Sequence, residues 1–372
     1  MGAQHRLLRA ARHLKRHSQS LSILCYHGVS KSDEHVWNPR LYIEAEVFRR
    51  RLQTIREFGY QVLPLSTALH HMREKRLTAP TVVITFDDGW HDFHSRGWPI
   101  LRAFGYPATV YQTTYYSQYN RPVFDPACAY LLWKGAGRII RYRDVDGTTA
   151  QLDLTQPAAV EQARQNLLTR AEERNTSAEQ KDRLLQRLAD AVGVDYGSFL
   201  ESRTLHLMND VEVREIAAAG IDVQLHTHRH RLPYNKQLFF RELDENRECI
   251  ESMTKKPASE FCYPNGAHRP ELIGWLREAG ITSATTCEPG RASYKSEPLL
   301  LPRLTDSSTI SQAKFESWLA GIGLIIPRCK RALRSVFVRE ATRPPHDEEP
   351  IEQASQRTTE ASASTKAAKT SA

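Results

Sequence analysis

Short apolar runs alternate with stretches of helical spacing along most of the chain. The runs are typical of strands buried on both faces, and Phe48, Leu52, Ile55 and Phe58 show the spacing of the first helix between them. Four of the predicted helices end at a glycine that precedes a large apolar residue: Gly59, Gly105, Gly220 and Gly280. Because strands that alternate with helices form a parallel sheet, we expect an α/β fold whose sheet closes into a barrel.

The number of apolar runs agrees with a barrel. Seven strands are predicted at residues 22–26, 82–86, 108–112, 223–225, 260–263, 282–286 and 299–303, and the irregular segments leave room for an eighth. Seven or eight strands are enough to close a barrel of this type around a core of inward side chains.

The pattern is interrupted at about residues 115–202. There the charged segment 161–191 carries leucines at helical spacing, which predicts added helices. We therefore expect a barrel domain at residues 21–310 that contains a helical insertion.

The two ends of the chain differ from the barrel. Residues 1–20 form a basic amphipathic segment, which predicts a helix that is either solvated or lies on a membrane surface. Residues 311–341 are expected to be helical, either at an interface or packed to close the barrel. Residues 342–372 contain almost no large apolar side chains, which predicts a disordered tail.

Composition narrows the classes of function. A net charge of +8 and a pI near 9.2 favour an anionic partner, such as a membrane surface, a phosphorylated lipid carrier or an acidic polymer. Nucleic acid is disfavoured because the basic residues are dispersed and no binding motif for it is present. The six cysteines form no Cys-x-x-Cys pair, and the N-terminal segment lacks the apolar core of a secretory signal. We therefore expect cytoplasmic residence, with the inner face of the membrane as a place of action.

Two adjacent carboxylates carry the first chemical signal. Asp87 and Asp88 follow the buried strand 82–86 and precede Gly89, so they are expected at the rim where barrel enzymes bind substrate. Neighbouring carboxylates repel each other unless a cation or a proton is shared between them. The alternative is a solvent-exposed pair that caps a helix.

Histidines follow another buried strand. His226 and His230 are expected on the same rim, on one face of the chain at either helical or extended spacing, with His228 ambiguous between them. Two imidazoles and one carboxylate bind a divalent metal and leave coordination positions open. A histidine-rich surface turn is the alternative.

Together, Thr-Phe-Asp-Asp-Gly at residues 85–89 and His-Thr-x-x-His at 226–230 resemble the first two motifs of the NodB-homology polysaccharide deacetylases, carbohydrate esterase family 4. The resemblance extends over about residues 22–303 and is weakest in the insertion. It implies a distorted (β/α)7-8 barrel and removal of N-acetyl groups from a sugar polymer or oligosaccharide. It also implies that Asp88, His226 and His230 bind the metal and that Asp87 is the general base toward the attacking water. Zinc is expected from the ligand types, although cobalt, nickel or iron would also suit them.

A third segment resembles the family's Arg-x-Pro-Tyr-Gly motif, with departures. Asn265 takes the position whose backbone N–H stabilises the oxyanion, and Cys262 stands where the family has the arginine that orients the base. We expect Arg303, at the end of a later strand, to replace that arginine. An ordinary surface arginine is the alternative.

The family's C-terminal histidine, which supplies the general acid, has no counterpart between His268 and His346. The segment Leu24-Cys25-Tyr26-His27-Gly28 resembles the N-terminal Tyr-His element of the permuted branch that includes poly-N-acetylglucosamine deacetylases. The resemblance implies that His27 is the acid, and a hydrogen-bonded core histidine is the alternative.

Two other functions are compatible with these motifs. The first is a metal-dependent amidohydrolase acting on a non-sugar amide or a cyclic imide, and the second is an inactive carbohydrate-binding scaffold. Aromatic residues near the rim, Trp90, Tyr111, Tyr115 and Tyr234, suit either a sugar platform or the core. A lipid-linked polysaccharide precursor is the expected substrate form if the basic ends contact the membrane. The sequence does not define the oligomeric state.

Overall fold

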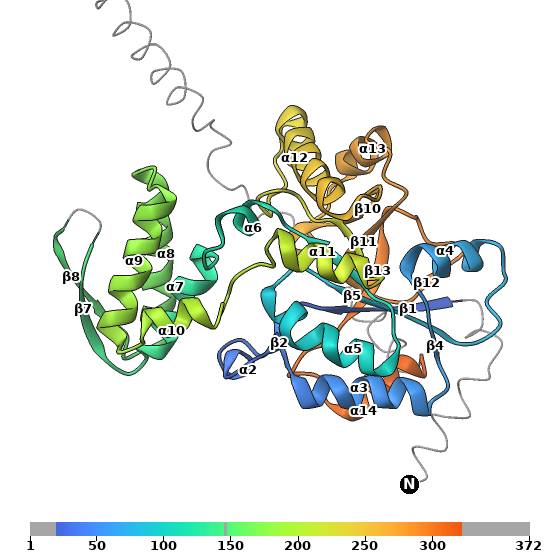
Figure 1. Cartoon of the computed structure of the whole chain (residues 1–372), viewed down its shortest axis with the longest axis horizontal. Helices are drawn as coiled ribbons and strands as arrows, with labels where there is room; N and C mark the ends of the chain where they lie inside the picture. Colours follow the sequence, from blue (N-terminus) through green and yellow to red (C-terminus); the bar gives the residue numbers. More distant parts are fainter. Residues whose placement is uncertain (1–19, 145–146, 322–372) are drawn as a thin grey trace, which may run out of the picture.

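Seven parallel strands close into a barrel in the computed structural model, which describes residues 20–144 and 147–321 (Figure 1). Around the barrel the strands follow the order β1, β13, β11, β10, β9, β6 and β5, and β5 pairs again with β1. Their bounds are Ser20–Tyr26 (β1), Thr81–Phe86 (β5), Thr109–Gln112 (β6), Asp222–Leu225 (β9), Glu260–Cys262 (β10), Ser283–Pro289 (β11) and Leu301–Thr305 (β13). The expected barrel and each of the seven expected strands are confirmed.

Short strands extend this sheet and flank its rim. β4 (Gln61–Val62) pairs with β5, β12 (Ala292–Ser293) runs antiparallel to β1, and β2 (Gly28–Ser30) pairs with β3 (Tyr42–Glu44). Helices surround the barrel (Figure 1). They are α2 (Glu34–Trp37), α3 (Ala45–Glu57), α4 (Leu65–Arg73), the π-helical turn η1 (Phe93–Gly97), α5 (Trp98–Phe104), α11 (Asp210–Ala218), α12 (Lys236–Thr254), the 3-10 turn η2 (Pro264–Gly266), α13 (Pro270–Glu278) and α14 (Gln312–Leu319).

The helix ends follow the glycine pattern of the sequence. Gly59, Gly105, Gly220 and Gly280 all have positive φ, which a residue without a Cβ adopts at little cost. Gly105 is the C-cap of α5 in the left-handed conformation. Each glycine therefore turns the chain from an outer helix back toward the barrel.

Part of the barrel interior is apolar. Side chains alternate along each strand between the interior and the surrounding helices. Leu21, Ile23, Val83 and Leu301 form one buried cluster, which continues into α4. The outward strand residues pack with the helices in a separate and larger cluster.

The insertion leaves the barrel after β6 and forms its own lobe (Figure 1). It contains α6 (Tyr115–Tyr119), α7 (Phe124–Lys134), β7 (Ile139–Arg143), β8 (Thr149–Asp153), α8 (Pro157–Glu173), α9 (Ala178–Val192) and α10 (Tyr196–Glu201). The helices expected at 161–191 are present as α8 and α9. The antiparallel hairpin β7–β8 was not expected, although its burial alternates with the period of two that marks a half-buried strand. A second buried cluster holds the lobe together.

Residues 1–19 and 322–372 lie outside the described part of the chain. Within the described part of the expected helical segment 311–341 lies α14, whose Phe315 and Leu319 are fully buried in the main core. The packing alternative therefore holds for α14, whereas the expectations for residues 1–19 and 322–372 concern undescribed parts of the chain. Among the described residues, no helix has the length and apolar content needed to cross a membrane.

Candidate active site at the carboxyl-terminal rim of the barrel

Asp87 and Asp88 leave β5 in different directions. The Asp87 N–H donates to the Tyr26 carbonyl (2.9 Å), so the chain still follows β1 at this residue. Asp88 then adopts a φ of 68° and Gly89 a φ of 80°, and both values lie in the left-handed region. A Cβ on Gly89 would lie 2.0 Å from the Gln112 side-chain oxygen, so only glycine fits there. This turn separates the two carboxylates, although they are adjacent in the sequence.

Asp88 lies against both expected histidine ligands. Its Oδ1 is 3.2 Å from His226 Nε2 and 3.3 Å from His230 Nε2. The three donor atoms lie within 4.8 Å of one another, as a shared divalent ion requires. The opposite nitrogen of His226, Nδ1, lies 2.8 Å from the Cys262 carbonyl oxygen, to which it can donate, leaving Nε2 free as a ligand. The donor set and its supporting contacts therefore fit a divalent metal.

The protonation states of Asp88 and His230 also suit metal binding, whereas His226 differs: burial alone would lower its pKa, but Cys262 and the hydrogen bond to Asp88 raise that pKa well above its usual value. Burial alone would raise the pKa of Asp88, but the hydrogen bond from His226 and the charges around it hold that pKa well below its usual range. Burial lowers the pKa of His230 to about 4, so its imidazole is neutral near pH 7. An ionised carboxylate and a neutral imidazole are the forms that coordinate metals.

The histidine segment is neither helical nor extended, contrary to the spacing expected from the sequence. Thr227 and His230 have φ values of 60° and 57°, so the chain coils and returns His230 to the side of His226. The ring centroids of these two histidines are 4.9 Å apart. His228 points elsewhere, with Nδ1 2.8 Å from Thr114 Oγ1, which excludes it from the donor set in this conformation.

Helix α12 holds this coiled segment in place. Asn246 is fully buried, accepts from the His226 N–H (2.9 Å) and donates to the Gln112 carbonyl (2.9 Å). The Glu242 carboxylate accepts from the Arg229 N–H (2.7 Å). These contacts fix the ends of β6 and β9 to one helix, and the sequence motifs gave no sign of them.

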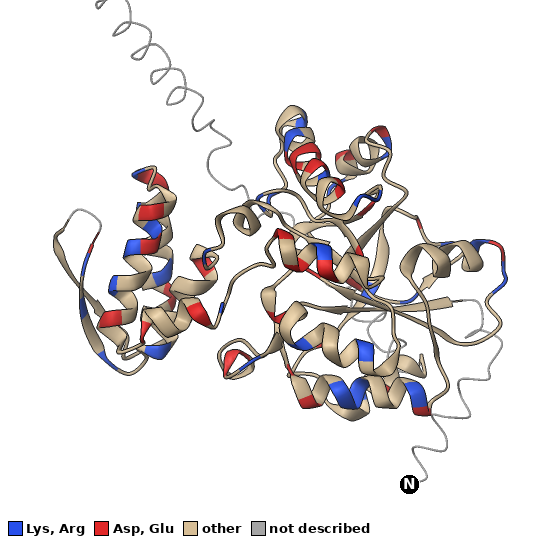
Figure 2. Ribbon diagram, in the orientation of Figure 1, with Lys and Arg blue, Asp and Glu red and all other residues tan. Residues whose placement is uncertain are grey.

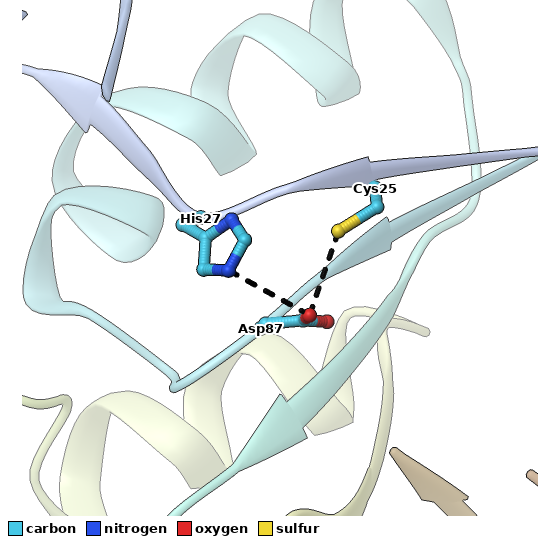
Figure 3. A group of neighbouring side chains, drawn as sticks. All are labelled: Cys25, His27 and Asp87. Atoms are coloured by element: carbon cyan, nitrogen blue, oxygen red, sulfur yellow. Dashed lines mark hydrogen bonds and ion pairs between the residues drawn. The ribbon is translucent and has the colours of Figure 1, made fainter. Parts of the chain in front are cut away.

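Asp87 forms a second centre, which borders the first, since a carboxylate oxygen of Asp87 lies within 4.8 Å of a His226 nitrogen. The guanidinium of Arg303 donates to both of its oxygens, from Nη1 to Oδ1 (2.7 Å) and from Nη2 to Oδ2 (2.6 Å). His27 Nε2 lies 3.8 Å from Oδ2 (Figure 3). Burial alone would raise the pKa of Asp87, but the charge of Arg303 outweighs it and holds the pKa well below its usual range. Arg303 thus contacts Asp87 as expected for a replacement of the missing arginine, and it is fully buried rather than on the surface.

Asn265 lies on the turn that follows β10. It is exposed and has a φ of 56° inside η2, and its neighbour Gly266 donates from its N–H to the Tyr263 carbonyl (2.8 Å). Cys262, at the end of β10, lies between this turn and Asp87, with its Sγ 3.5 Å from Asp87 Oδ2. The turn with Asn265 therefore follows, in the sequence, a residue that contacts the base, and it borders the site.

The aromatic residues expected near the rim fall into different environments. Trp90 is buried, and its Nε1–H donates to Asp88 Oδ2 (2.9 Å), so it supports a ligand instead of offering a platform. Tyr111 is fully buried inside the barrel, and the guanidinium of Arg303 lies over its ring. Tyr115 is half-buried against His228, and Tyr234 is exposed. Of the four, Tyr115 and Tyr234 remain accessible to a sugar.

Comparisons with known proteins agree with this fold and rim. A family model described as polysaccharide deacetylase matches residues 74–146 and 182–284. The Bacillus subtilis polysaccharide deacetylase homologue YxkH is 30% identical over 305 residues, which cover 80% of this chain and 76% of that protein. The poly-beta-1,6-N-acetyl-D-glucosamine N-deacetylase of Escherichia coli is 34% identical over 86 residues, 23% of this chain and 12% of that protein.

Solved structures share the barrel. The Streptococcus pyogenes deacetylase PplD in complex with acetate has a TM-score of 0.52 at 16% identity, covering 78% of this chain and 94% of that one. IcaB from Ammonifex degensii has a TM-score of 0.51 at 16% identity, covering 82% and 97%. The closed parallel barrel agrees with a fold of NodB-homology type, and the family match identifies a hydrolase. The chain belongs to the polysaccharide deacetylase family and is a deacetylase.

Proposed function

We propose that this deacetylase is metal-dependent and removes N-acetyl groups from an N-acetylated hexosamine polymer or oligosaccharide. The observation that supports it best is the division of labour between two adjacent carboxylates. Asp88 faces two histidines, whereas Asp87 faces Arg303 and His27. One carboxylate is thus available as a ligand and the other as a base.

The chemistry of the donors favours zinc at Asp88, His226 and His230, with cobalt, nickel or iron as alternatives. A divalent ion at these residues would polarise the acetyl carbonyl and acidify water. Trp90 and the Cys262 carbonyl would hold the ligands in orientation through their hydrogen bonds to Asp88 and His226.

The remaining steps belong to the side chains of the second centre. Asp87, ionised and fixed by Arg303, takes a proton from the attacking water. Because Arg303 lowers the basicity of this carboxylate, the proton does not remain there, and His27 Nε2 at 3.8 Å is the neighbour that can receive it. His27 then protonates the leaving amine. The backbone N–H of Asn265 donates to the carbonyl oxygen as it gains negative charge.

Poly-N-acetylglucosamine is the substrate class to test first, since the Escherichia coli relative is named for that polymer. Acetate release from N-acetylglucosamine oligomers would be measured with the metal-loaded chain, with and without chelator. A cyclic imide serves as the competing substrate. Acetate release that is lost with chelator and restored by zinc is expected. Turnover of the imide alone would overturn the proposal.

His27 has its own test. We expect His27→Gln to lower kcat by about a hundredfold, as loss of a general acid typically does, while metal content stays at the wild-type level. Substrates with a better leaving group than a sugar amine should recover most of the loss, because they need less protonation. An equal loss with both kinds of substrate would remove His27 from the proton route.

Action at a membrane on a lipid-linked precursor is the remaining part of the proposal. Its support is the net charge of +8. On the described helices Lys and Arg are interspersed with Asp and Glu (Figure 2), so the contact would have to involve the basic segment 1–20 or the segment 311–341. Sedimentation of the full chain with anionic vesicles tests it, and no binding at low salt would reject it.

A further inference from the structure

Another group of histidines and carboxylates lies outside the active site, where two helical segments face each other. His91 and His94 are three residues apart in the helical stretch that contains η1, and Glu212 and Glu215 are three residues apart in α11. His91 Nδ1 lies 2.9 Å from Glu212 Oε1, and His94 Nε2 lies 2.8 Å from Glu215 Oε2. Because residues three apart share one face of a helix, a His-x-x-His pair here faces a Glu-x-x-Glu pair.

The donor atoms of this group are close enough to share one ion. Ligand atoms of His91, His94 and Glu212 all lie within 4.8 Å of one another. Imidazole and carboxylate ligands bind zinc at about 2.0–2.2 Å, so donors on one ion are roughly 3–3.5 Å apart. Small side-chain rotations would therefore close the set around an ion. The side chains of His94 and Glu215 are 21% and 53% exposed, so an ion can enter from solvent and take Glu215 or water as a further ligand.

The inner side of the group is fixed by hydrogen bonds. Glu212 Oε2 accepts from the Asn209 N–H (3.0 Å), and its Oε1 accepts from Arg203 Nη1 (2.6 Å), which orients the carboxylate. Burial lowers the pKa of His91, so its ring loses its proton easily, as coordination requires. The charge of Arg203 opposes a cation, so we expect weaker metal binding here than at Asp88 and loss of the ion on dialysis.

We propose that His91, His94 and Glu212 form a separate binding site for a divalent metal ion on the flank of the barrel. Two imidazoles and a carboxylate favour zinc, and they also suit cobalt, nickel or copper. Calcium and magnesium are disfavoured, because both prefer ligand sets made of oxygen atoms. The site does not depend on the proposed function, since it shares no ligand with the Asp88 site.

The position of this site gives the ion a structural role. The segment after Asp88 pairs with the segment that leads into α11, because the Met208 N–H donates to the Gly89 carbonyl (2.8 Å) and the His91 N–H to the His206 carbonyl (2.8 Å). An ion held by His91 and by a carboxylate of α11 would add a link beside these two hydrogen bonds. We therefore expect zinc at this site to stabilise the fold.

Zinc binding is measured on the full chain with Asp88→Ala and His226→Ala, which together remove two of the three proposed ligands at the rim. The dialysed protein is titrated with Zn²⁺ in competition with a chromophoric chelator, and its Tm is measured with and without zinc. We expect one zinc ion to bind each chain and to raise Tm, because the donor atoms are brought together only in the folded protein. No zinc binding by this folded variant would overturn the proposal.

His94→Gln, added to that variant, assigns the ligands. Glutamine can still donate to Glu215, so Tm without zinc should not change, whereas zinc affinity should fall at least tenfold and the rise in Tm should disappear. His71→Gln is the matched control, because His71 belongs to a surface histidine pair on α4, with its ring centroid 6.0 Å from that of His70. It should leave zinc binding unchanged.

The otherwise native chain gives a second measurement, which remains available if the variant with both rim substitutions fails to fold. There, His94→Gln should lower by one the number of zinc ions bound at saturation, and His71→Gln should not. Equal zinc binding with and without His94→Gln, or an equal loss with His71→Gln, would overturn the proposal, since the zinc would then be held elsewhere or by surface histidines in general.

Discussion

The two ends of the barrel interior hold the same kind of side chain in opposite protonation states. At the carboxyl-terminal end, Asp87 is buried and Asp88 is partly buried, both have cations or imidazoles beside them, and their pKa values are held low. At the amino-terminal end, burial and the neighbouring Asp222 raise the pKa of Glu260 to about 8. Asp222 and Glu260 begin β9 and β10, and burial also raises the pKa of Asp222. Burial alone therefore does not decide whether a carboxyl group is charged. The charge of the group beside it decides this.

This difference in protonation state suits the carboxyl groups at the two ends of the barrel to different roles. Charged carboxylates at the carboxyl-terminal rim can bind a metal or take up a proton, whereas the neutral carboxyl group at the other end can do neither near pH 7. This division agrees with the general rule that barrel enzymes carry their catalytic residues at the carboxyl-terminal rim.

Removal of Asp88 should have the largest effect. We expect Asp88→Ala to lower kcat/KM by about a thousandfold or more, because the histidines lose the carboxylate that completes the donor set. Metal content, measured on the dialysed protein, should fall in step. Glu260→Ala, which removes a buried carboxyl group at the other end, should keep its metal. Full activity of Asp88→Ala would show that the ligand assignment is wrong.

Arg303→Lys should have the next largest effect. Lysine keeps the charge but cannot donate to both Asp87 oxygens, so we expect kcat to fall by about ten- to a hundredfold and stability by about 1.5–3 kcal/mol. Burial would then raise the Asp87 pKa, and the acidic limb of the profile of kcat/KM against pH should move to higher pH. Stopped assays across the pH range measure the shift.

Arg51→Lys is the matched control for that variant. Arg51 is also almost completely buried, and its Nε donates to Asp306 Oδ2 (3.0 Å), away from the site. Its replacement should cost a similar amount of unfolding free energy without moving the pH profile. If both variants shift the profile of kcat/KM against pH equally, Arg303 affects that profile only through its effect on the stability of the fold.

The sequence predicted those site residues whose position depends on strand order alone. Asp88, His226 and Arg303 each follow or end an apolar run, and parallel strands of a closed barrel bring such residues to one rim. Residue type then suggested the role of each. The β7–β8 hairpin was missed because it lies in the interrupted region 115–202, for which only the later segment 161–191, with its leucines at helical spacing, gave a prediction.

Contacts that depend on side-chain direction could not be predicted in this way. Cys25, Cys262 and Cys287 meet around the proposed base and its guanidinium partner because all three occupy inward positions on separate strands, which requires the register of the barrel. Asn246 reaches His226 from a helix 20 residues further along the chain. Neither arrangement leaves a periodic trace in the sequence, so only the three-dimensional fold reveals it.

The neutral carboxyl group at the amino-terminal end should make stability depend on pH. The native pKa of Glu260, about 8, lies above its ordinary value of 4.5, so between these values the folded chain holds a proton that the unfolded chain has lost. Stability from this group is therefore complete below about pH 4.5 and falls by about 1.4 kcal/mol per pH unit as the pH rises toward 8.

Glu260→Gln should remove this dependence, because glutamine resembles the neutral carboxyl group at every pH. Urea unfolding at several pH values between about 5 and 9 would show a flatter curve for the variant, with the largest gain over wild type at the alkaline end. Asp222→Asn should flatten the curve less, since Asp222 only adds to the effect of burial. Parallel curves for Glu260→Gln and wild type would mean that Glu260 is ionised in the folded protein.

The smallest effect is expected at the point where the insertion meets the proposed metal ligands. Trp90 packs in the buried cluster of the insertion, next to Leu207, while its Nε1–H donates to Asp88 Oδ2. Trp90→Phe keeps most of the packing and removes the hydrogen bond, so we expect metal affinity to fall by about tenfold, as for other residues that orient a ligand. Competition with a chromophoric chelator measures it.

Trp133→Phe provides the comparison within the same cluster. Trp133 packs against that cluster beside Tyr130, from helix α7 of the insertion. The two variants should lose similar packing, but only Trp90→Phe should weaken metal binding. If both weaken it equally, the insertion acts on the rim through its overall stability. If only Trp90→Phe does, a single indole N–H connects the insertion to Asp88.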